Sequence, residues 1–208
     1  MSKIPTFEVR KFTNTPMASG ATLGDQHRLR LDCLLESSAA ATDPDSYGQM
    51  VAISFKDMEA VTSSYLKALL FPMFPSLSQK PGAPAYSPMR ASNVYPVLSN
   101  VSSEIKDEVQ ELLQNHTINL LELKNAGHGD IPSAYLYGSL EGVLAETLRL
   151  LVTVGEATAP ELHRRGKGPG AVTAWNNRLN DLFARRLARR RRDGRQWMFR
   201  AVAEPTNV

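Results

Sequence analysis

The chain has 208 residues, and its hydrophobic share of 42% and charged share of 22% are those of an ordinary globular protein with one or two domains. No apolar run approaches the ~20 residues that span a membrane, and the N-terminus lacks the apolar region of a signal peptide, so we expect a cytoplasmic protein without membrane contact. A single cysteine, Cys33, excludes an internal disulfide and a cysteine-based zinc site.

The first half of the chain is expected to alternate strands with helices. The expected elements, in chain order, are strands over Thr6–Thr13, Arg28–Glu36 and Met50–Phe55, a helix over Ser63–Phe71, a strand over Asn93–Leu98, a helix beginning at Ser102 or Ser103, and a strand over Ile118–Leu123. This alternation favours βαβ units with a mixed or parallel sheet. Cys33 falls within a run of alternating leucines, which predicts a buried strand residue rather than a reactive thiol.

Two segments without regular structure are expected in this half. Residues 72–92 carry five prolines among glycine and serines, which indicates a surface loop or linker. The loop Gly127-His128-Gly129-Asp130 follows the last expected strand, and we take it as the boundary region. His128 and Asp130 are also the one pair that suggests a small-molecule site. We therefore expect a sensing or interaction domain over residues 1–132 and a second domain over residues 133–208.

The run Val51–Leu66 resembles the central strand, loop and helix of STAS-like domains. In those domains an apolar strand leads through a short acidic loop to a Ser-rich helix N-terminus, where a partner kinase phosphorylates a serine in the anti-sigma antagonists of the fold. The resemblance implies that Ser63 and Ser64 are phosphorylation sites. Two residues depart from the pattern, because Ser54 stands where Asp is frequent and Tyr65 replaces the glycine after the serine pair. The residues by themselves favour the simpler interpretation that the hydroxyl groups of Thr62 to Ser64 cap the helix.

The last third of the chain begins with its most regular amphipathic stretch. Apolar residues recur at helical spacing over Leu140–Val154 and predict a helix. Thr158 and Glu161 have the spacing of a capping box, which predicts a short helix over Ala159–Arg165.

A glycine-rich turn over residues 166–170 is expected to end that short helix, after which Thr173 offers the N-cap of a longer one. The longer helix should be apolar on one side and polar on the other. Its expected inner residues are Trp175, Leu179, Leu182, Phe183 and Leu187, and its expected outer residues are Asn176, Asn177, Asn180 and Ala184.

A basic hairpin is predicted to follow. The segments Ala188–Arg192 and Arg195–Val202 flank Asp193-Gly194, a strong signal for a two-residue turn. Residues 138–208 carry thirteen Lys and Arg against seven Asp and Glu, whereas residues 1–137 carry eleven against fourteen. The basic charge is therefore concentrated near the hairpin, where guanidinium groups can bind phosphate oxygens or enter a narrow minor groove.

The segment from Ser139 to Val202 resembles the winged helix-turn-helix domains of bacterial transcription regulators of the MarR and ArsR type. These share a capped helix, a turn, a recognition helix and a basic wing closed by an aromatic strand. Arg186 departs from the pattern, since it stands where such domains usually have the glycine that ends the recognition helix. A non-glycine residue in such a left-handed cap costs roughly 1 kcal/mol.

The resemblance implies that the partner is double-stranded DNA, with base edges read by the exposed asparagines and phosphates held by the basic side chains. The expected DNA-binding residues are Lys167, Thr173, Asn176, Asn177, Arg178, Asn180, Arg185, Arg189, Arg190, Arg191, Arg192 and Arg195. Winged helices also serve as protein-docking modules, so a solvated arginine surface that binds a protein stays open as an alternative.

No enzymatic constellation is recognisable, because no nucleophile is paired with a base and the four histidines lack metal-ligand spacing. We expect neither catalysis nor a metal or cofactor. Our first hypothesis is an α/β transcription regulator that acts as a homodimer and senses a ligand or partner through its STAS-like half. The alternative is a phosphorylation-dependent interaction switch that has a kinase or ATPase as its partner and binds a protein through its winged helix.

Overall fold

The computed structural model describes residues 4–43, 45–74, 93–114, 116, 118–124, 131–166 and 170–208. Within these ranges the chain has a mixed α/β fold with six α-helices, which confirms the expected α/β class. The proline-rich loop lies outside the described residues from residue 75 onward, and so do His128 and Asp130. None of the described helices combines the length and the apolar character needed to cross a membrane.

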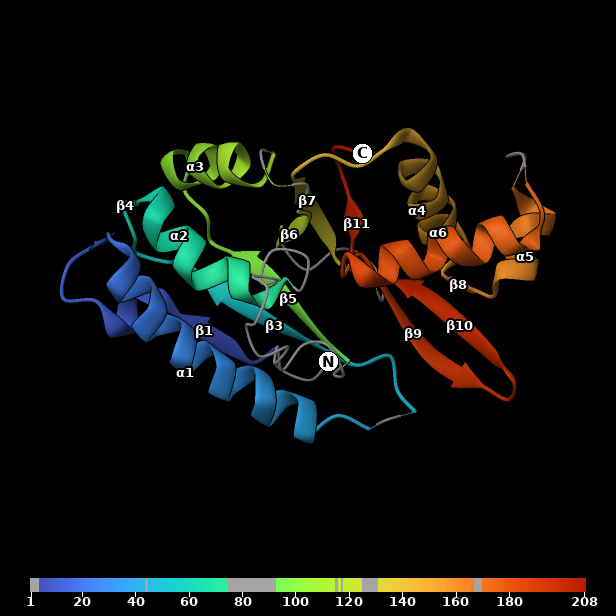
Figure 1. Ribbon diagram of the computed structural model, residues 1–208, viewed down its shortest axis with the longest axis horizontal. Coiled ribbons are helices and arrows are strands. Elements are labelled where there is room, and N and C mark those ends of the chain that lie inside the picture. Colours follow the sequence, from blue (N-terminus) through green and yellow to red (C-terminus); the bar gives the residue numbers. More distant parts are fainter. Residues whose placement is uncertain are drawn as a thin grey trace, which may run out of the picture.

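A six-stranded mixed sheet forms the middle of the molecule (Figure 1). Its strands, in order across the sheet, are β1 (Thr6–Glu8), β3 (Gln49–Ser54), β5 (Val94–Ser99), β6 (Leu120–Leu123), β7 (Ser133–Tyr137) and β11 (Glu204–Pro205). The first four strands are parallel, β7 is antiparallel to β6, and β11 is parallel to β7. The strands expected near residues 50, 93 and 118 are therefore confirmed.

Three helices, which we call the N-terminal layer, cover one face of this sheet: α1 (Ala21–Ala40), α2 (Ser63–Leu70) and α3 (Ser103–Gln114). They lie on the same side because each connects two neighbouring parallel strands by a right-handed crossover. Val51 and Ile53 of β3 pack against these helices, whereas Ala52 between them faces the other way. The smaller elements here are η1 (Val9–Phe12), β2 (Met17–Ala18), β4 (Ala60–Val61) and η2 (Phe71–Met73).

The strand expected over Arg28–Glu36 is wrong, because this segment lies inside α1. The buried residues of α1 recur at helical intervals, and they are Gly24, His27, Leu31, Leu35 and Ser38. Only two of these residues are aliphatic, so a hydrophobicity pattern does not show the helical period. The alternating leucines of the same segment instead give the pattern of a strand. Cys33 consequently lies on the outer side of a helix and is exposed rather than buried.

The expected first strand is confirmed only in part, because the ladder with β3 ends at Glu8 and the chain then turns into η1. This turn places the Phe12 ring edge-to-face against the ring of His27, a buried residue of α1, with 6.0 Å between the ring centroids. His27 Nε2 lies 3.1 Å from the Phe12 carbonyl oxygen, and Nδ1 lies 2.8 Å from the Tyr65 hydroxyl. A neutral imidazole satisfies both contacts, with Nε2–H donating to Phe12 and Nδ1 accepting from Tyr65.

Stability should depend on pH through this histidine. Burial lowers the pKa of His27, the bond to Phe12 opposes that shift, and the charge of Arg30 adds to it. As the pH falls below about 6.5, the unfolded chain binds a proton that the folded ring resists, so the free energy of unfolding should decline until the lowered pKa is reached. Urea unfolding of the His27→Gln variant between pH 4.5 and 7.5 should show a flatter profile. An identical slope in wild type and variant would contradict this, and His163→Gln in α5 is the control.

The remaining elements form the C-terminal unit: α4 (Gly142–Val154), β8 (Glu156–Ala157), α5 (Ala159–Arg165), α6 (Val172–Ala184), β9 (Ala188–Asp193) and β10 (Gln196–Ala201). Strand β10 is the middle of a three-stranded antiparallel sheet, with β8 and β9 at its edges. Figure 1 shows this unit on the side of the central strands away from α1 and α2. The three expected helices and the expected hairpin of this region are thus confirmed, and Val143, which is part of the apolar pattern of α4, is 50% exposed.

The C-terminal unit and the central sheet share one hydrophobic core. Tyr95, Leu121 and Leu136 of the sheet belong to the same buried cluster as Leu148 and Phe199 of the unit. The chain also returns to the sheet after the unit, because β11 pairs with β7. The sheet therefore includes residues on both sides of the boundary expected at residue 132, and the molecule consists of three successive layers.

Candidate nucleic-acid interface

Helix α5 begins as the sequence predicts. The Thr158 hydroxyl accepts a hydrogen bond from the Glu161 N–H at 3.4 Å, and the Glu161 carboxylate accepts one from the Thr158 N–H at 2.7 Å. These bonds complete a capping box. The bond from the Thr158 N–H, followed by that from the hydroxyl, lowers the pKa of Glu161. Helix α5 is thereby fixed at the point where it meets the hairpin and α6.

Helix α6 buries one side and exposes the other. Its buried residues are Trp175, Leu179 and Leu182, and its exposed residues include Thr173, Asn176 and Asn177. The prediction that Thr173 caps the helix is wrong, because Ala171 is the N-cap and Thr173 lies in the first turn. The N-cap residue makes no side-chain capping bond, and within the described part of the chain the amide donors of the first turn are left for solvent or a bound acceptor.

The end of α6 contains an arginine in the left-handed region. Arg186 has a φ of 61°, at the position where winged helices usually have glycine. The Leu187 N–H bonds to the Leu182 carbonyl at 2.9 Å, and the Arg186 N–H bonds to the Phe183 carbonyl at 3.0 Å. This pair of bonds is the Schellman pattern, which ends the helix and fixes the direction in which β9 leaves it.

The hairpin turn is displaced by one residue from its expected position. Asp193 pairs with Gln196, so the central residues of the turn are Gly194 and Arg195 rather than Asp193 and Gly194. Gly194 has a φ of 59°, and glycine at the first central position is typical of a type II′ turn. The Arg195 side chain is consequently exposed at the tip of the hairpin.

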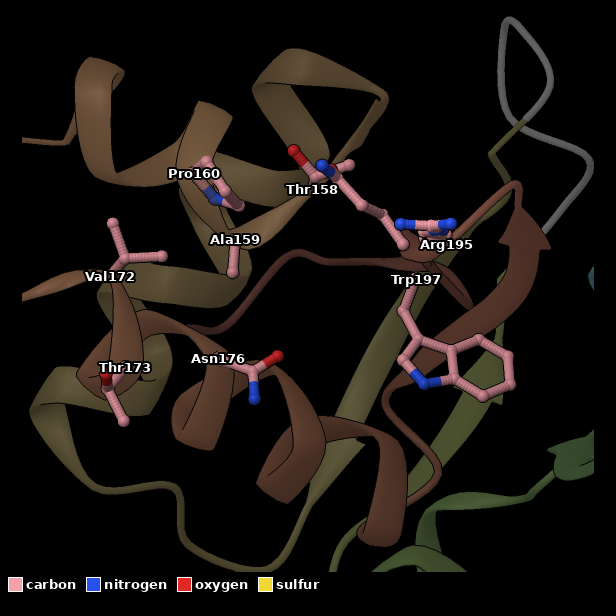
Figure 2. Close-up of a pocket in the computed structure, with 9 residues that line it drawn as sticks. Thr158, Ala159, Pro160, Val172, Thr173, Asn176, Arg195 and Trp197 are labelled. Carbon is pink, nitrogen blue, oxygen red and sulfur yellow. The ribbon is translucent and has the colours of Figure 1, made fainter.

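A groove of about 410 Å³ lies between α6 and the hairpin (Figure 2). The residues along it are Val172, Thr173 and Asn176 from α6, Arg195, Gln196 and Trp197 from the hairpin, and Thr158, Ala159 and Pro160 at the start of α5. Its walls combine hydroxyl and amide groups with a guanidinium group and an indole edge. Such a set can bind a polyanion that also presents hydrogen-bonding edges.

Several arginines expected to surround the hairpin are instead bound to the protein. Arg185 donates to the side-chain oxygens of Asn119 at 3.1 Å and of Glu141 at 3.2 Å. Arg189 donates to the Val202 carbonyl at 2.9 Å, and its burial is the main cause that lowers its pKa to about 10. Both guanidinium groups therefore face the protein in the free chain, contrary to what we expected.

Arg190 connects the hairpin to α6. Its guanidinium donates to the Asn180 side-chain oxygen at 3.0 Å and lies between two rings, 3.9 Å from that of Phe183 and 4.2 Å from that of Trp197. Burial is the main cause that lowers the pKa of Arg190. Asn180, which we expected to point outward, is thus held by the hairpin.

Two further arginines of the expected site, Arg191 and Arg178, also lie near other side chains of the protein. The Arg191 guanidinium lies 3.8 Å from the Glu156 carboxylate on β8. The Arg178 guanidinium lies 5.0 Å from the centroid of the Trp175 ring. Lys167 lies outside the described residues.

Arg192 and Arg195 are the exposed arginines of the hairpin. The Arg192 guanidinium lies 4.0 Å from the centroid of the Trp197 ring, on which Arg190 also stacks, and it donates to the Arg195 carbonyl at 3.4 Å. These contacts hold Arg192 near the tip. The sequence did not single out Trp197. Trp197 and the buried Phe199 are two residues apart on β10 and therefore share one face of the strand, which could have placed Trp197 on the side facing α6.

The serines of the STAS resemblance lie at the start of α2. The Ser63 hydroxyl donates to the Glu108 carboxylate of α3, whereas Ser64 is exposed. The Thr62 hydroxyl accepts from the Tyr65 N–H at 3.4 Å, so the capping interpretation is confirmed for Thr62. Phosphorylation of either serine stays a prediction.

Acidic substitutions should distinguish the two serines. Ser63→Glu removes a hydrogen bond and places a carboxylate against Glu108, so it should destabilise the fold by about 1–3 kcal/mol. Ser64→Glu adds a negative charge at an exposed helix N-terminus and should change stability by less than about 1 kcal/mol, in the stabilising direction. Urea unfolding of both variants measures the difference. Equal destabilisation by the two substitutions would show that the Ser63–Glu108 contact does not determine the change in the free energy of unfolding.

Neither a scan against protein-family models nor searches of curated proteins and of solved structures found a match to this chain. The resemblances to winged helix-turn-helix and STAS-like domains consequently remain predictions.

Proposed function

We propose that this protein is a DNA-binding transcription regulator whose C-terminal unit is a winged helix-turn-helix, with α6 as the recognition helix and the β9–β10 hairpin as the wing. The order of the elements supports the assignment: a helix, a short strand, two further helices, and a hairpin whose second strand pairs with the short strand. That order is the one implied by the resemblance to MarR-type and ArsR-type domains.

The observation that carries the proposal is the polar surface shared by α6 and the hairpin tip. Asn176 is exposed on α6 and lines the same groove as Arg195. An α-helix fits the major groove of DNA, and asparagine is the residue type that bonds bidentately to adenine. In the proposed complex Thr173, Asn176 and Asn177 face base edges, while Arg192 and Arg195 bind phosphates or the adjacent minor groove.

The other parts of the proposal concern the assembly and its signal. One winged helix reads only a few base pairs, so we propose a homodimer on a palindromic site. The STAS-like N-terminal layer would then sense a ligand or partner. The core that the central sheet shares with the C-terminal unit supports this role, because a change in the sheet is transmitted by direct packing.

Selection from a random-sequence DNA pool, repeated at two salt concentrations, tests the proposed function. Enrichment of a palindromic motif, with log affinity falling steeply against log salt, is the expected result. A steep fall without an enriched motif would leave a nonspecific nucleic-acid binder. Absence of binding at low salt would overturn the proposal in favour of a protein-docking surface.

A second candidate function is the phosphorylation-dependent interaction switch, and the exposure of Ser64 at the start of α2 is the observation that favours it. Mass spectrometry of the protein from its native host tests this candidate. A phosphate on Ser64 together with weak DNA binding would favour the switch. Unmodified serines together with tight DNA binding would favour the regulator.

A further inference from the structure

Arg191 is held by two residues that belong to different layers of the molecule. The Tyr47 hydroxyl donates to the Glu156 carboxylate at 2.8 Å, and the other oxygen of that carboxylate lies 3.8 Å from the Arg191 guanidinium. The same guanidinium lies 5.3 Å from the centroid of the Tyr47 ring. Tyr47 comes from the segment between α1 and β3, Glu156 from β8, and Arg191 from the arginine-rich strand of the hairpin.

The position of Tyr47 is fixed by the central sheet. The next residue, Gly48, has a φ of 79°, and a Cβ there would lie 2.1 Å from the Asn93 carbonyl oxygen. That carbonyl also accepts from the Gln49 N–H at 2.8 Å. The close approach ties the segment to the start of β5, so Tyr47 moves with the N-terminal half of the molecule rather than with the hairpin.

The hydroxyl of Tyr47 is a stable donor. Burial, with a smaller contribution from the bond to Glu156, raises the pKa of Tyr47 to about 12. The phenol is therefore protonated at neutral pH and keeps the carboxylate oriented toward Arg191. Because Glu156 is about half exposed, the ion pair itself is weak, and its geometry depends on the tyrosine that orients it.

We propose that Tyr47, Glu156 and Arg191 form a latch by which the N-terminal half of the molecule withholds Arg191 from DNA phosphates and thereby sets the affinity of the hairpin for DNA. The inference rests on the proposed function and names the regulation of the same site. A ligand or partner that displaces the segment carrying Tyr47 would release one cation, Arg191, on strand β9 of the hairpin. Release adds about one phosphate contact, which tightens binding to every DNA sequence alike.

Salt-dependent DNA binding of the full chain tests the latch. Tyr47→Phe and Glu156→Gln should each raise the affinity for a mixed-sequence duplex about threefold or more and steepen the slope of log affinity against log salt by up to ~0.9. Glu146→Gln on the exposed side of α4 changes the net charge equally and is the control for Glu156→Gln. Arg191→Gln should leave the wild-type affinity unchanged and cancel the gain when combined with Tyr47→Phe.

Two results would overturn the latch while the proposed function stands. One is DNA binding with the same affinity and slope in Glu156→Gln and Glu146→Gln. The other is a loss of affinity in Arg191→Gln alone, which would show that Arg191 already contacts DNA in the wild type. A wild type and variants that all fail to bind DNA at low salt would instead overturn the proposed function, and the latch with it. Unfolding curves of each variant establish that it is folded.

Discussion

Replacing Leu136 with Ala is expected to lower the free energy of unfolding by about 2–5 kcal/mol, the usual cost of emptying a buried leucine site. The same replacement should weaken the central sheet and the C-terminal unit together. Leu136 lies in β7, is 3% exposed, and belongs to the buried cluster that contains residues of α4, α5, α6 and β10. The cavity therefore opens between the two layers rather than inside one of them.

The backbone around Leu136 strengthens this expectation. Asn207 donates to the Leu136 carbonyl at 2.9 Å and accepts from the Leu136 N–H at 2.8 Å, so one amide side chain from the C-terminal end replaces a strand partner. Loss of packing at Leu136 should therefore also weaken the attachment of the segment that contains β11 and Asn207 to the central sheet. Leu29→Ala makes the same chemical deletion on the outer side of α1, where the side chain is 61% exposed, and should change stability by less than about 0.5 kcal/mol.

Urea unfolding followed by two signals measures the effect. Both tryptophans, Trp175 and Trp197, lie in the C-terminal unit, so their fluorescence reports on that unit, whereas far-ultraviolet circular dichroism reports on all helices and strands. The two transitions should coincide in the wild type and shift together in Leu136→Ala. A fluorescence transition that stays in place while the dichroism signal divides into two steps would show two independent domains.

Local signals in the sequence predicted the elements of the C-terminal unit well. The capping box of Thr158 and Glu161, the apolar period of α6 and the glycine of the hairpin turn each act within a few residues, and each is found in the structure. The left-handed backbone of Arg186 also follows from its place after the last helical turn. In α1, by contrast, the helical stripe includes a buried glycine, histidine and serine, so the hydrophobic period misled the prediction.

The environment of the arginines could not be predicted, because their partners are distant in sequence. Arg185 meets Asn119 of the loop before β6, and Arg191 meets Glu156 of β8, which Tyr47 orients from the first half of the chain. A count of charges treats all these groups as free cations. In the folded protein several of these arginines bind other residues, so fewer arginines are available to bind a nucleic acid.

The same reasoning explains why the sheet extends past the expected boundary. The composition changes near residue 130, and basic residues outnumber acidic residues only beyond it. Strand pairing follows a different pattern, since β7 continues the sheet antiparallel to β6 and β11 closes it after the C-terminal unit. The pairing of strands that are distant in sequence depends on the burial of both faces of the sheet. Residue patterns within a few positions do not predict that burial.

Replacing both Arg192 and Arg195 with Gln is expected to weaken binding of the proposed regulator to any DNA duplex by about 10- to 50-fold near 0.15 M salt, and to reduce the salt slope by about 1.8. These two side chains are the exposed arginines of the hairpin, so DNA phosphates can reach both guanidinium groups from solvent. Fluorescence anisotropy with a fixed duplex, measured over a range of salt concentrations, gives both quantities.

Replacing Asn176 and Asn177 with Ala should produce a different pattern. Each good bidentate contact to a base contributes about 1–3 kcal/mol of discrimination, so the variant should lose preference for the selected site while its salt slope stays unchanged. Arg185→Gln is the matched control for the hairpin pair, because it removes the same charge from a group already bound to Asn119 and Glu141. It should lower stability more than DNA affinity. If Arg185→Gln reduced the salt slope as much per arginine as the hairpin pair, the division between exposed and protein-bound arginines would not describe how this surface binds DNA.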